Sequence, residues 1–351
     1  MTIQINPLDT LIFRDGRPFG SDSDGWANSL MLPSLTSIYG ALRAIYFAQN
    51  SKKINVSNIT DDNDPTKNLI IKNLFFISKN IPIFPIPKDL VLKSKNDKNI
   101  YSLDLIENTT TSNSLEMIFK SAFDNASKAN GFLTKSNFSK YLKGNKKVQF
   151  KSLENYILSE AKIGIGRNDN TKSVDEGKLY RVGLKRYRNL SIIVDFEGIE
   201  IEEEGLLRFG GEGKGAYYKS IDDINLPQCE KLDSDIFKLI LLTPAIFEQG
   251  WIPDFIKDNF EGEFEKIKVK LIATAIGKAE YIGGWDIQKN KPKSMFKAVP
   301  AGSVYYFKLL NSSDRDKIVE AFNYKSIVKL ENFKKEGYGV SVVGNYKKDA
   351  K

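Results

Sequence analysis

Hydrophobic and polar residues alternate over the first positions of the chain, which is the pattern of a strand with one buried face. The alternation begins at Ile3 and Ile5 and ends in the turn-forming stretch 14–18. After Ser34, whose hydroxyl suits a helix cap, apolar residues recur at helical spacing through positions 38–46. The sequence therefore opens with a predicted strand, a loop and a helix that ends near residue 49.

Residues 50–150 lose this regularity and are rich in Asn, Lys and Ser, so we interpret them as an insertion. Within it, the apolar run 69–77 predicts a buried strand, and the basic stretch 134–147 predicts a mobile loop. Residues 114–128 and 152–162 are predicted helices, the first of which ends before an Asn-Gly pair.

The second half of the chain repeats the order of the first. Strands are predicted at 179–194, where β-branched and aromatic residues are frequent, and a glycine-dense loop follows at 209–216. A further strand, loop, helix and strands then lead to the glycine-containing stretch 336–339 and a closing strand. The helix of this second unit is predicted at 314–322.

This faint duplication predicts an α+β fold. Each half suits a βαββαβ unit with an antiparallel sheet, so we expect two tandem ferredoxin-like (RRM-like) domains. The N-terminal domain would span 1–228 and hold the insertion at about 50–150, and the C-terminal domain would span 229–351.

Composition excludes several classes of chemistry. The 351 residues include no histidine and a single cysteine, so Ser-His-Asp and Cys-His catalysis, Cys/His zinc sites and internal disulfides are unavailable. We predict neither a metal nor a cofactor. The chain has no apolar run of membrane-spanning length and no secretion signal at its start, so we expect a cytoplasmic protein that does not enter a membrane.

Charge is unevenly placed along the chain. The sequence carries 52 basic and 44 acidic residues, a net charge of +8, which weakly suggests a polyanionic partner. Residues 162–188 hold eight basic and three acidic side chains, whereas residues 195–204 hold six acidic and no basic ones. Only nine of the basic residues are arginine, and arginine forms bidentate contacts with phosphate that lysine cannot form. Ordinary surface ion pairs are the alternative explanation.

The glycine loop does not fit a nucleotide-binding P-loop. In that motif a glycine stands six residues before the lysine, and Ser or Thr follows the lysine directly. If Lys214 were the lysine, these two places would be occupied by Arg208 and Gly215. Backbone N–H groups beside Lys214 would instead suit RNA phosphates. A tight connection between strands, without any ligand, is the alternative.

Two further segments allow a functional and a structural interpretation. Segment 164–172 and Tyr180 combine Arg, Lys, Asn and an aromatic ring, the mixture used on unpaired RNA, although a solvated hairpin has the same composition. Asp9, Asp15, Asp22 and Asp24 lie in one loop, and carboxylates gathered in this way are one feature of a two-metal nuclease site. Their place in a loop rich in Gly and Ser favours turns and ion pairs instead.

Several motifs together resemble one known family. They are PLDTLIFRDGRPF at 7–19, PS at 33–34 with YGALR at 39–43, RNDNTK at 167–172 with EGKLYR at 176–181, RFGGEGKGA at 208–216, LTPA at 242–245, GGW at 283–285 and VPAGSVY at 299–305. Their order resembles the RAMP subunit of the Cmr complex that holds the 5′ end of CRISPR RNA (crRNA) in type III-B effectors. The resemblance leaves the insertion essentially unmatched.

The resemblance implies two ferredoxin-like domains, a thumb-like hairpin at about 162–188, and a position capping the crRNA-bound backbone filament. It implies a noncatalytic, RNA-binding subunit in antiviral defence that grips the repeat-derived 5′ tag of crRNA. Its implied neighbours are the large polymerase/cyclase-like subunit and the adjoining backbone RAMP subunit, with target RNA contacted indirectly. The lack of histidine agrees with a subunit that does not cleave RNA.

Carried over residue by residue, the resemblance predicts two groups of RNA contacts. The first grips the tag and comprises Arg14, Arg17, Ser34, Thr36, Arg43, Gly210, Gly211 and Lys214. The second lies on the thumb and comprises Arg167, Asn168, Lys172 and Arg181, with Tyr180 as a stacking face. Two alternatives stay open: a metal-dependent RAMP endoribonuclease that uses the loop aspartates, and a pure scaffold whose basic stretches meet acidic protein surfaces.

Overall fold

The structure of the chain is a computed structural model. It describes residues 1–13, 26–27, 29–52, 54, 59–60, 62–109, 114–167, 171, 173–286 and 291–348. In this part of the chain the helices are few and short beside the strands. They are α1 (Leu35–Gln49), α2 (Lys135–Leu142), α3 (Ile318–Phe322) and α4 (Glu331–Lys335), with 3₁₀ turns η2 (Leu153–Asn155) and η3 (Ser312–Lys317). None of these helices combines the length and the apolar character that a membrane span requires.

One large sheet is built from the first part of the chain. Its order is β12 (Lys151–Ser152), β10 (Gly131–Thr134), β4 (Ile81–Pro85), β3 (Ile70–Ser78), β15 (Ser191–Glu197), β1 (Thr2–Pro7), β17 (Gly215–Ser220) and β16 (Glu204–Arg208). All its pairings are antiparallel. On one face, Ile38 and Leu42 of α1 are fully buried in the core that contains Ile5 and Ile192.

A second large sheet is built from the last part. Its order is β19 (Glu261–Phe264), β20 (Ile267–Ala275), β25 (Val304–Leu309), β18 (Ile236–Leu241), β27 (Val340–Asn345) and β26 (Lys325–Ser326), again antiparallel throughout. Ile318 and Phe322 of α3 are buried in its core with Phe237 and Phe307. The chain is therefore α+β, with α1 packed on the first sheet and α3 packed on the second.

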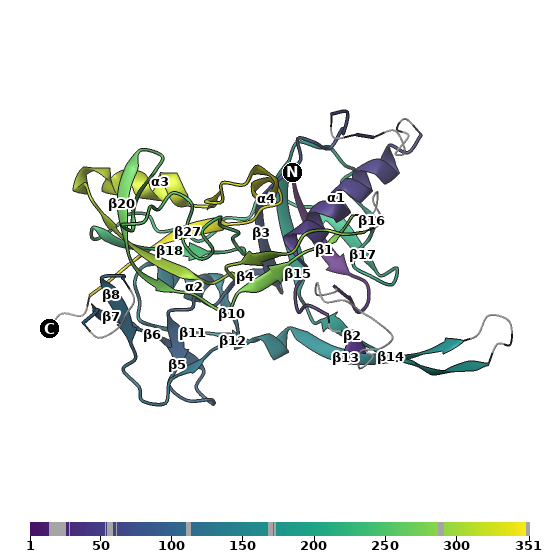
Figure 1. Cartoon of the computed structure of the whole chain (residues 1–351), viewed down its shortest axis with the longest axis horizontal. Helices are drawn as coiled ribbons and strands as arrows, with labels where there is room; N and C mark the ends of the chain where they lie inside the picture. Colours follow the sequence, from purple (N-terminus) through teal and green to yellow (C-terminus); the bar gives the residue numbers. More distant parts are fainter. Residues whose placement is uncertain are drawn as a thin grey trace.

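Smaller sheets complete the molecule. They are β11 (Lys147–Gln149), β6 (Asn99–Ser102), β5 (Leu90–Leu92) and β9 (Ser127–Lys128); β13 (Ile157–Arg167), β14 (Val174–Tyr187) and β2 (Trp26–Ala27); β21 (Glu280–Ile282) and β24 (Phe296–Ala298); β22 (Trp285–Asp286) and β23 (Lys291–Pro292); and β7 (Asp104–Glu107) and β8 (Met117–Lys120). The hairpin of β13 and β14 projects from the body of the molecule (Figure 1).

The residues predicted as an insertion supply β3, β4 and β10 to the first large sheet, and others fill the space between the two large sheets. Its buried residues, among them Phe84 and Phe138, share one core with Ile193 of the first sheet and with Ile240 and Tyr306 of the second. Because this core draws on both sheets and the insertion, the insertion is part of the central packing and not an appendage.

Three predicted elements are wrong. Residues 114–128 form strands β8 and β9, and residues 152–162 form β12, a 3₁₀ turn and the start of β13, where helices were predicted. The predicted mobile loop 134–147 contains α2, whose Phe138 and Tyr141 are fully buried. In the two predicted helices, pairing between strands overrides the local pattern. The loop prediction followed the basic composition of 134–147 and passed over the helical spacing of its apolar residues. The opening helix, the strand 69–77 and the closing strand are confirmed.

Candidate functional site

The glycine loop, residues 209–215, folds back against the segment 8–13 that follows β1. The Gly211 N–H donates to the Ile12 carbonyl at 2.8 Å, and the Leu8 N–H donates to the Gly215 carbonyl at 3.2 Å. Gly210 has φ +87°, and a Cβ there would lie 2.6 Å from the Ile12 oxygen. Gly210 is thus required by a close approach of the chain to itself, as the strand-connection alternative expects.

Asp9 joins two cations beside this loop. Its Oδ2 accepts from the Lys214 Nζ at 3.0 Å, and its Oδ1 lies 3.3 Å from Arg186 Nη2. The Lys214 ammonium also donates to the Thr10 hydroxyl at 3.0 Å. The hydrogen bond from Lys214, supported by the Thr10 backbone, lowers the pKa of Asp9 to about 2. Asp9 is therefore an ionised partner of two cations.

The base of the β13–β14 hairpin is tied to the same place. Leu11 and Lys185 exchange two backbone hydrogen bonds of 2.8 Å. Arg186 donates to both carboxylate oxygens of Glu160 through Nε and Nη2, and this contact lowers the pKa of Glu160. We call the meeting point of segment 8–13, the glycine loop and the hairpin base the loop–hairpin junction.

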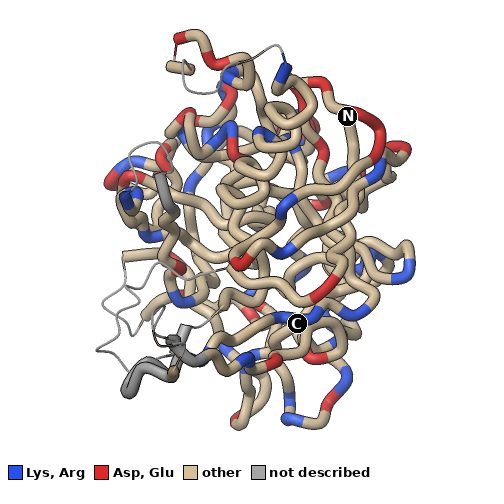
Figure 2. Tube along the Cα trace, turned by 90° about the vertical axis from the view of Figure 1, so that its right-hand side faces the viewer, with Lys and Arg blue, Asp and Glu red and all other residues tan. Residues whose placement is uncertain are grey.

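Charges at the loop–hairpin junction are balanced locally. Lys162 Nζ lies 2.9 Å from Glu212 Oε2, which adds a third cation and a third carboxylate to the two sets above. Along the described part of the trace, basic and acidic residues are interspersed (Figure 2). For a polyanion to bind at the junction, the cations there would therefore have to exchange their carboxylate partners for its phosphates.

The predicted contacts on α1 have other partners. Ser34 caps the helix, because its Oγ accepts from the Ser37 N–H at 3.2 Å. The Thr36 hydroxyl donates to Glu336 of the second half of the chain. The guanidinium of Arg43 donates to Asp64 at 2.6 Å and to Thr66 at 2.8 Å. The described contacts of these three side chains are thus with structural partners and not with the glycine loop.

Six of the predicted RNA contacts, two of the tag-gripping group and four on the thumb, cannot be placed. Arg14, Arg17, Asn168 and Lys172 lie outside the described residues, as do the side chains of Arg167 and Tyr180 in β13 and β14. Arg181 is exposed on β14, opposite Ile163 of β13.

The loop–hairpin junction also contains residues that sequence reasoning did not select as RNA contacts. Lys162 and Arg186 lie within the basic segment 162–188, which was a usable signal. Glu160 and Glu212 gave no signal, because their roles depend on which cation the fold brings beside them.

The structure contains no evident metal site in the part of the chain that it describes. There, no three acidic, histidine or cysteine side chains are grouped as ligands. Of the aspartates considered for a nuclease site, Asp9 is ion-paired, and Asp15, Asp22 and Asp24 lie outside the described residues.

Two solved structures that contain a chain of similar fold are of a type III-B Cmr complex. A chain in the cryo-EM structure of the Type III-B Cmr-beta bound to cognate target RNA and AMPPnP, state 1, matches with a TM-score of 0.55 at 17% identity, covering 99% of this chain and 95% of that chain. A chain in Type III-B Cmr-beta bound to cognate target RNA matches with a TM-score of 0.54 at 17% identity, covering 96% and 95%. At these identities the matches establish a shared fold.

Sequence comparison gives the family. No curated protein matches the sequence significantly. The family model described as CRISPR-associated protein (Cas_Cmr3) matches residues 3–346, nearly the whole chain. The resemblance seen in the sequence motifs is thereby confirmed: the chain belongs to the Cas_Cmr3 family of CRISPR-associated proteins.

Proposed function

We propose that this chain is a noncatalytic RNA-binding subunit of a type III-B CRISPR effector complex that grips the repeat-derived 5′ tag of crRNA. It would act in the cytoplasm, between the large polymerase/cyclase-like subunit and the adjoining backbone RAMP subunit. Membership of the Cas_Cmr3 family supports the assignment to a Cmr complex. The relatives of similar fold were solved in complexes with target RNA.

The proposal includes a tandem ferredoxin-like architecture. In the first sheet, the central order β3-β15-β1-β17 is the order 2-3-1-4 of a βαββαβ unit, with α1 between its first two strands. In the second sheet, β20-β25-β18-β27 gives the same order, with α3 between its last two strands. Each unit then retains one of the two usual helices, and the strand order is what supports the assignment.

The observation that carries the proposed RNA contact is the loop–hairpin junction. There the backbone of the glycine loop is held against segment 8–13, and Lys214 and Arg186 meet at one carboxylate. A phosphate could replace Asp9 between these two cations at little electrostatic cost, because both ligands are anionic oxygens. The hairpin that starts here extends outward, as a thumb on neighbouring RNA would (Figure 1).

A binding titration tests this contact. Full-length protein is titrated with a fluorescent single-stranded RNA that carries the 5′ tag, as wild type and as Lys214→Glu. Loss of a charge-assisted phosphate contact is expected to weaken binding by about tenfold, and binding should weaken as salt rises. Lys329→Glu is the matched control, because Lys329 is exposed and paired with Glu248 far from the junction in sequence.

The outcomes separate the proposal from its alternatives. Equal binding by wild type and Lys214→Glu, with no salt dependence, would favour the scaffold. Metal-dependent loss of the RNA that disappears in Asp9→Ala would favour the endoribonuclease. Weakened binding by Lys214→Glu alone, with the RNA intact in Mg²⁺ or Mn²⁺, would support a noncatalytic grip on RNA.

A further inference from the structure

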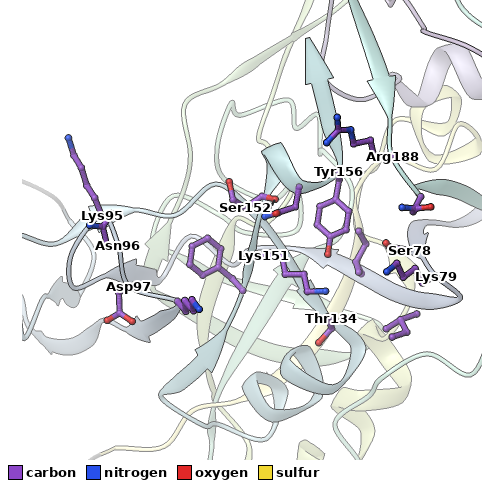
Figure 3. Close-up of a pocket in the computed structure, with 16 residues that line it drawn as sticks. Ser78, Lys79, Lys95, Asn96, Asp97, Thr134, Lys151, Ser152, Tyr156 and Arg188 are labelled. Carbon is purple, nitrogen blue, oxygen red and sulfur yellow. Dashed lines mark hydrogen bonds between the residues drawn. The ribbon is translucent and has the colours of Figure 1, made fainter. Parts of the chain in front are cut away.

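A second cationic feature lies next to the base of the hairpin. It is a pocket of about 570 Å³ lined mainly by the insertion (Figure 3). Its walls are the β3–β4 turn at 78–79, the β5–β6 loop at 95–98, the stretch 150–156, and Arg188 with Asn189 just after β14. We call it the insertion pocket. Its volume is in the range of pockets that hold a nucleotide-sized group.

The lining of the insertion pocket is strongly basic. It contains five cations and one carboxylate, namely Lys79, Lys95, Lys98, Lys151 and Arg188 against Asp97. The Asp97 carboxylate is occupied within its own loop, where its Oδ1 accepts from the Asn99 N–H at 2.9 Å and from the Asn99 side chain at 3.1 Å. Among the described ion pairs, none includes any of these five cations.

This arrangement differs from that of the loop–hairpin junction. At the junction, Lys162, Arg186 and Lys214 are each paired with a carboxylate. The lining of the insertion pocket instead has five cations and one carboxylate, and only a weak effect of Arg188 on Glu160 links these cations to the junction carboxylates. Lysines gathered around a hollow repel one another unless an anion joins them, so the pocket favours an anionic ligand.

Neutral groups in the pocket are suited to a nucleotide. The Tyr156 hydroxyl points into the pocket toward Lys151 (Figure 3). Burial raises the pKa of this phenol, so it stays a hydrogen-bond donor. Ser152 and Asn155 add a hydroxyl and an amide, and half-buried Phe150 offers an aromatic surface. Donors and an aromatic ring beside cations are the mixture that binds single-stranded nucleic acid.

The pocket adjoins the strand that carries Arg186, because Arg188 in its lining comes just after β14. Arg188 comes two residues after Arg186, so along an extended strand their Cα atoms are about 7 Å apart on the same side. The Arg188 N–H donates to the Tyr156 carbonyl at 2.7 Å, which continues the pairing of the hairpin. Both arginines act on Glu160, whose pKa is lowered mainly by Arg186 and slightly by Arg188.

We propose that the insertion pocket binds a segment of single-stranded RNA next to the segment held at the loop–hairpin junction, so that the insertion extends the RNA path. This inference rests on the proposed function. An acidic protein segment would satisfy the lysines alone, but RNA also uses the hydroxyl, amide and aromatic groups, and Arg188 lies just after the strand that carries Arg186.

The test compares two triple variants of the full-length protein. Lys79→Glu/Lys151→Glu/Arg188→Glu reverses three pocket charges. Lys266→Glu/Lys268→Glu/Lys308→Glu makes the same change in charge at exposed positions of the second sheet and of its β19–β20 turn. Each is titrated with a single-stranded guide RNA that carries the 5′ tag, and separately with a single-stranded RNA of target sequence, over a series of salt concentrations. Thermal unfolding verifies that both variants fold.

The pocket variant is expected to bind at least one RNA about tenfold more weakly or worse, and to reduce the slope of log affinity against log salt by about two for three lost phosphate contacts. Whichever of the two RNAs, guide or target, binds more weakly to the pocket variant is the RNA that the pocket contacts. The control triple should keep its slope within about one unit.

Equal loss in both triple variants would overturn the inference, because it would reflect net charge alone. Unchanged RNA binding by the pocket variant, while Lys214→Glu weakens it, would also overturn the inference and leave the proposed function standing. Unchanged RNA binding by the pocket variant and by Lys214→Glu would refute both the inference and the proposed function. Loss of co-purifying protein subunits from the pocket variant, with RNA binding intact, would identify a protein occupant and overturn the inference.

Discussion

The Lys238 ammonium lies 3.1 Å from the Asp89 carboxylate in the interior, where the two side chains are 4% and 0% exposed. Asp89 belongs to the insertion and Lys238 to β18 of the second sheet. The hydroxyls of Tyr141 and Tyr306 donate to the same carboxylate at 2.7 Å and 2.6 Å. Burial raises the pKa of both phenols, so they remain donors. This network fastens the insertion to the second sheet.

Replacing Lys238 by Met should destabilise the protein by about 3–5 kcal/mol, because Asp89 then loses its cationic partner while it stays buried. Urea unfolding measures the change. Lys329→Met is the matched control: its pair with Glu248 is exposed, and its loss should cost less than about 1 kcal/mol. Equal costs for the two substitutions would show that the buried pair does not hold the insertion in place.

The role of the insertion could not be predicted from its sequence. Its Asn- and Lys-rich composition is typical of a surface segment, and the pairing of Asp89 with Lys238 joins positions far apart in the chain. The apolar spacing of Phe138, Tyr141 and Leu142 was a usable signal for α2. Strand β8 gave no such signal, because it forms by pairing with β7 and by the contact of Phe119 with Tyr306.

Gly210→Ala should destabilise the protein and weaken RNA binding. A Cβ at this positive φ would lie 2.6 Å from a backbone oxygen of Ile12, so the glycine loop would have to leave segment 8–13. Gly213→Ala is the control, since its φ of +67° gives backbone strain of about 1 kcal/mol but nothing lies within 4 Å of the new Cβ. Urea unfolding and RNA titration of both variants measure the two effects. A smaller loss of stability and of RNA binding in Gly210→Ala than in Gly213→Ala would contradict the prediction.

Glu336 should make stability depend on pH. Burial raises its pKa above the ordinary value of 4.5, against the opposing effects of the Thr36 hydrogen bond, Lys293 and Arg43. Because the folded-state pKa is the higher one, the favourable contribution is present below pH 4.5 and is lost as pH rises through the folded-state pKa.

Glu336→Gln should therefore become more stable relative to wild type as the pH rises from 4.5 to neutral. Urea unfolding at several pH values measures this difference. Glu331→Gln, at a neighbouring carboxylate that is 72% exposed, should show little change. A stability difference between Glu336→Gln and wild type that does not vary with pH would refute the assignment.

Ser34→Ala should lower the free energy of unfolding by about 1 kcal/mol, because α1 loses the side-chain cap on the Ser37 N–H. Ser34→Gly should cost only a few tenths of a kcal/mol. Thermal or urea unfolding gives these values, and RNA titration shows whether Ser34 also contacts RNA. A cost at Ala no larger than that at Gly would mean that the cap is not stabilising.

The candidate site could be predicted only in part. The glycine loop and Lys214 were selected from the sequence, and the structure places both at the loop–hairpin junction. Arg43 was selected from the resemblance, but its partner Asp64 comes from the insertion, and neither the resemblance nor composition reveals such a pair. Lys162 and Arg186 become part of the site only when the hairpin folds beside segment 8–13.

The central claim is that the protein holds the 5′ tag of crRNA. The most direct test is to purify the tagged protein from its native host, sequence the RNA that accompanies it, and map ultraviolet crosslinks to residues. We expect guide RNAs that share one repeat-derived 5′ end, with crosslinks within 164–215 or 14–43. Mixed or absent RNA, from a preparation that retains its partner subunits, would contradict the claim.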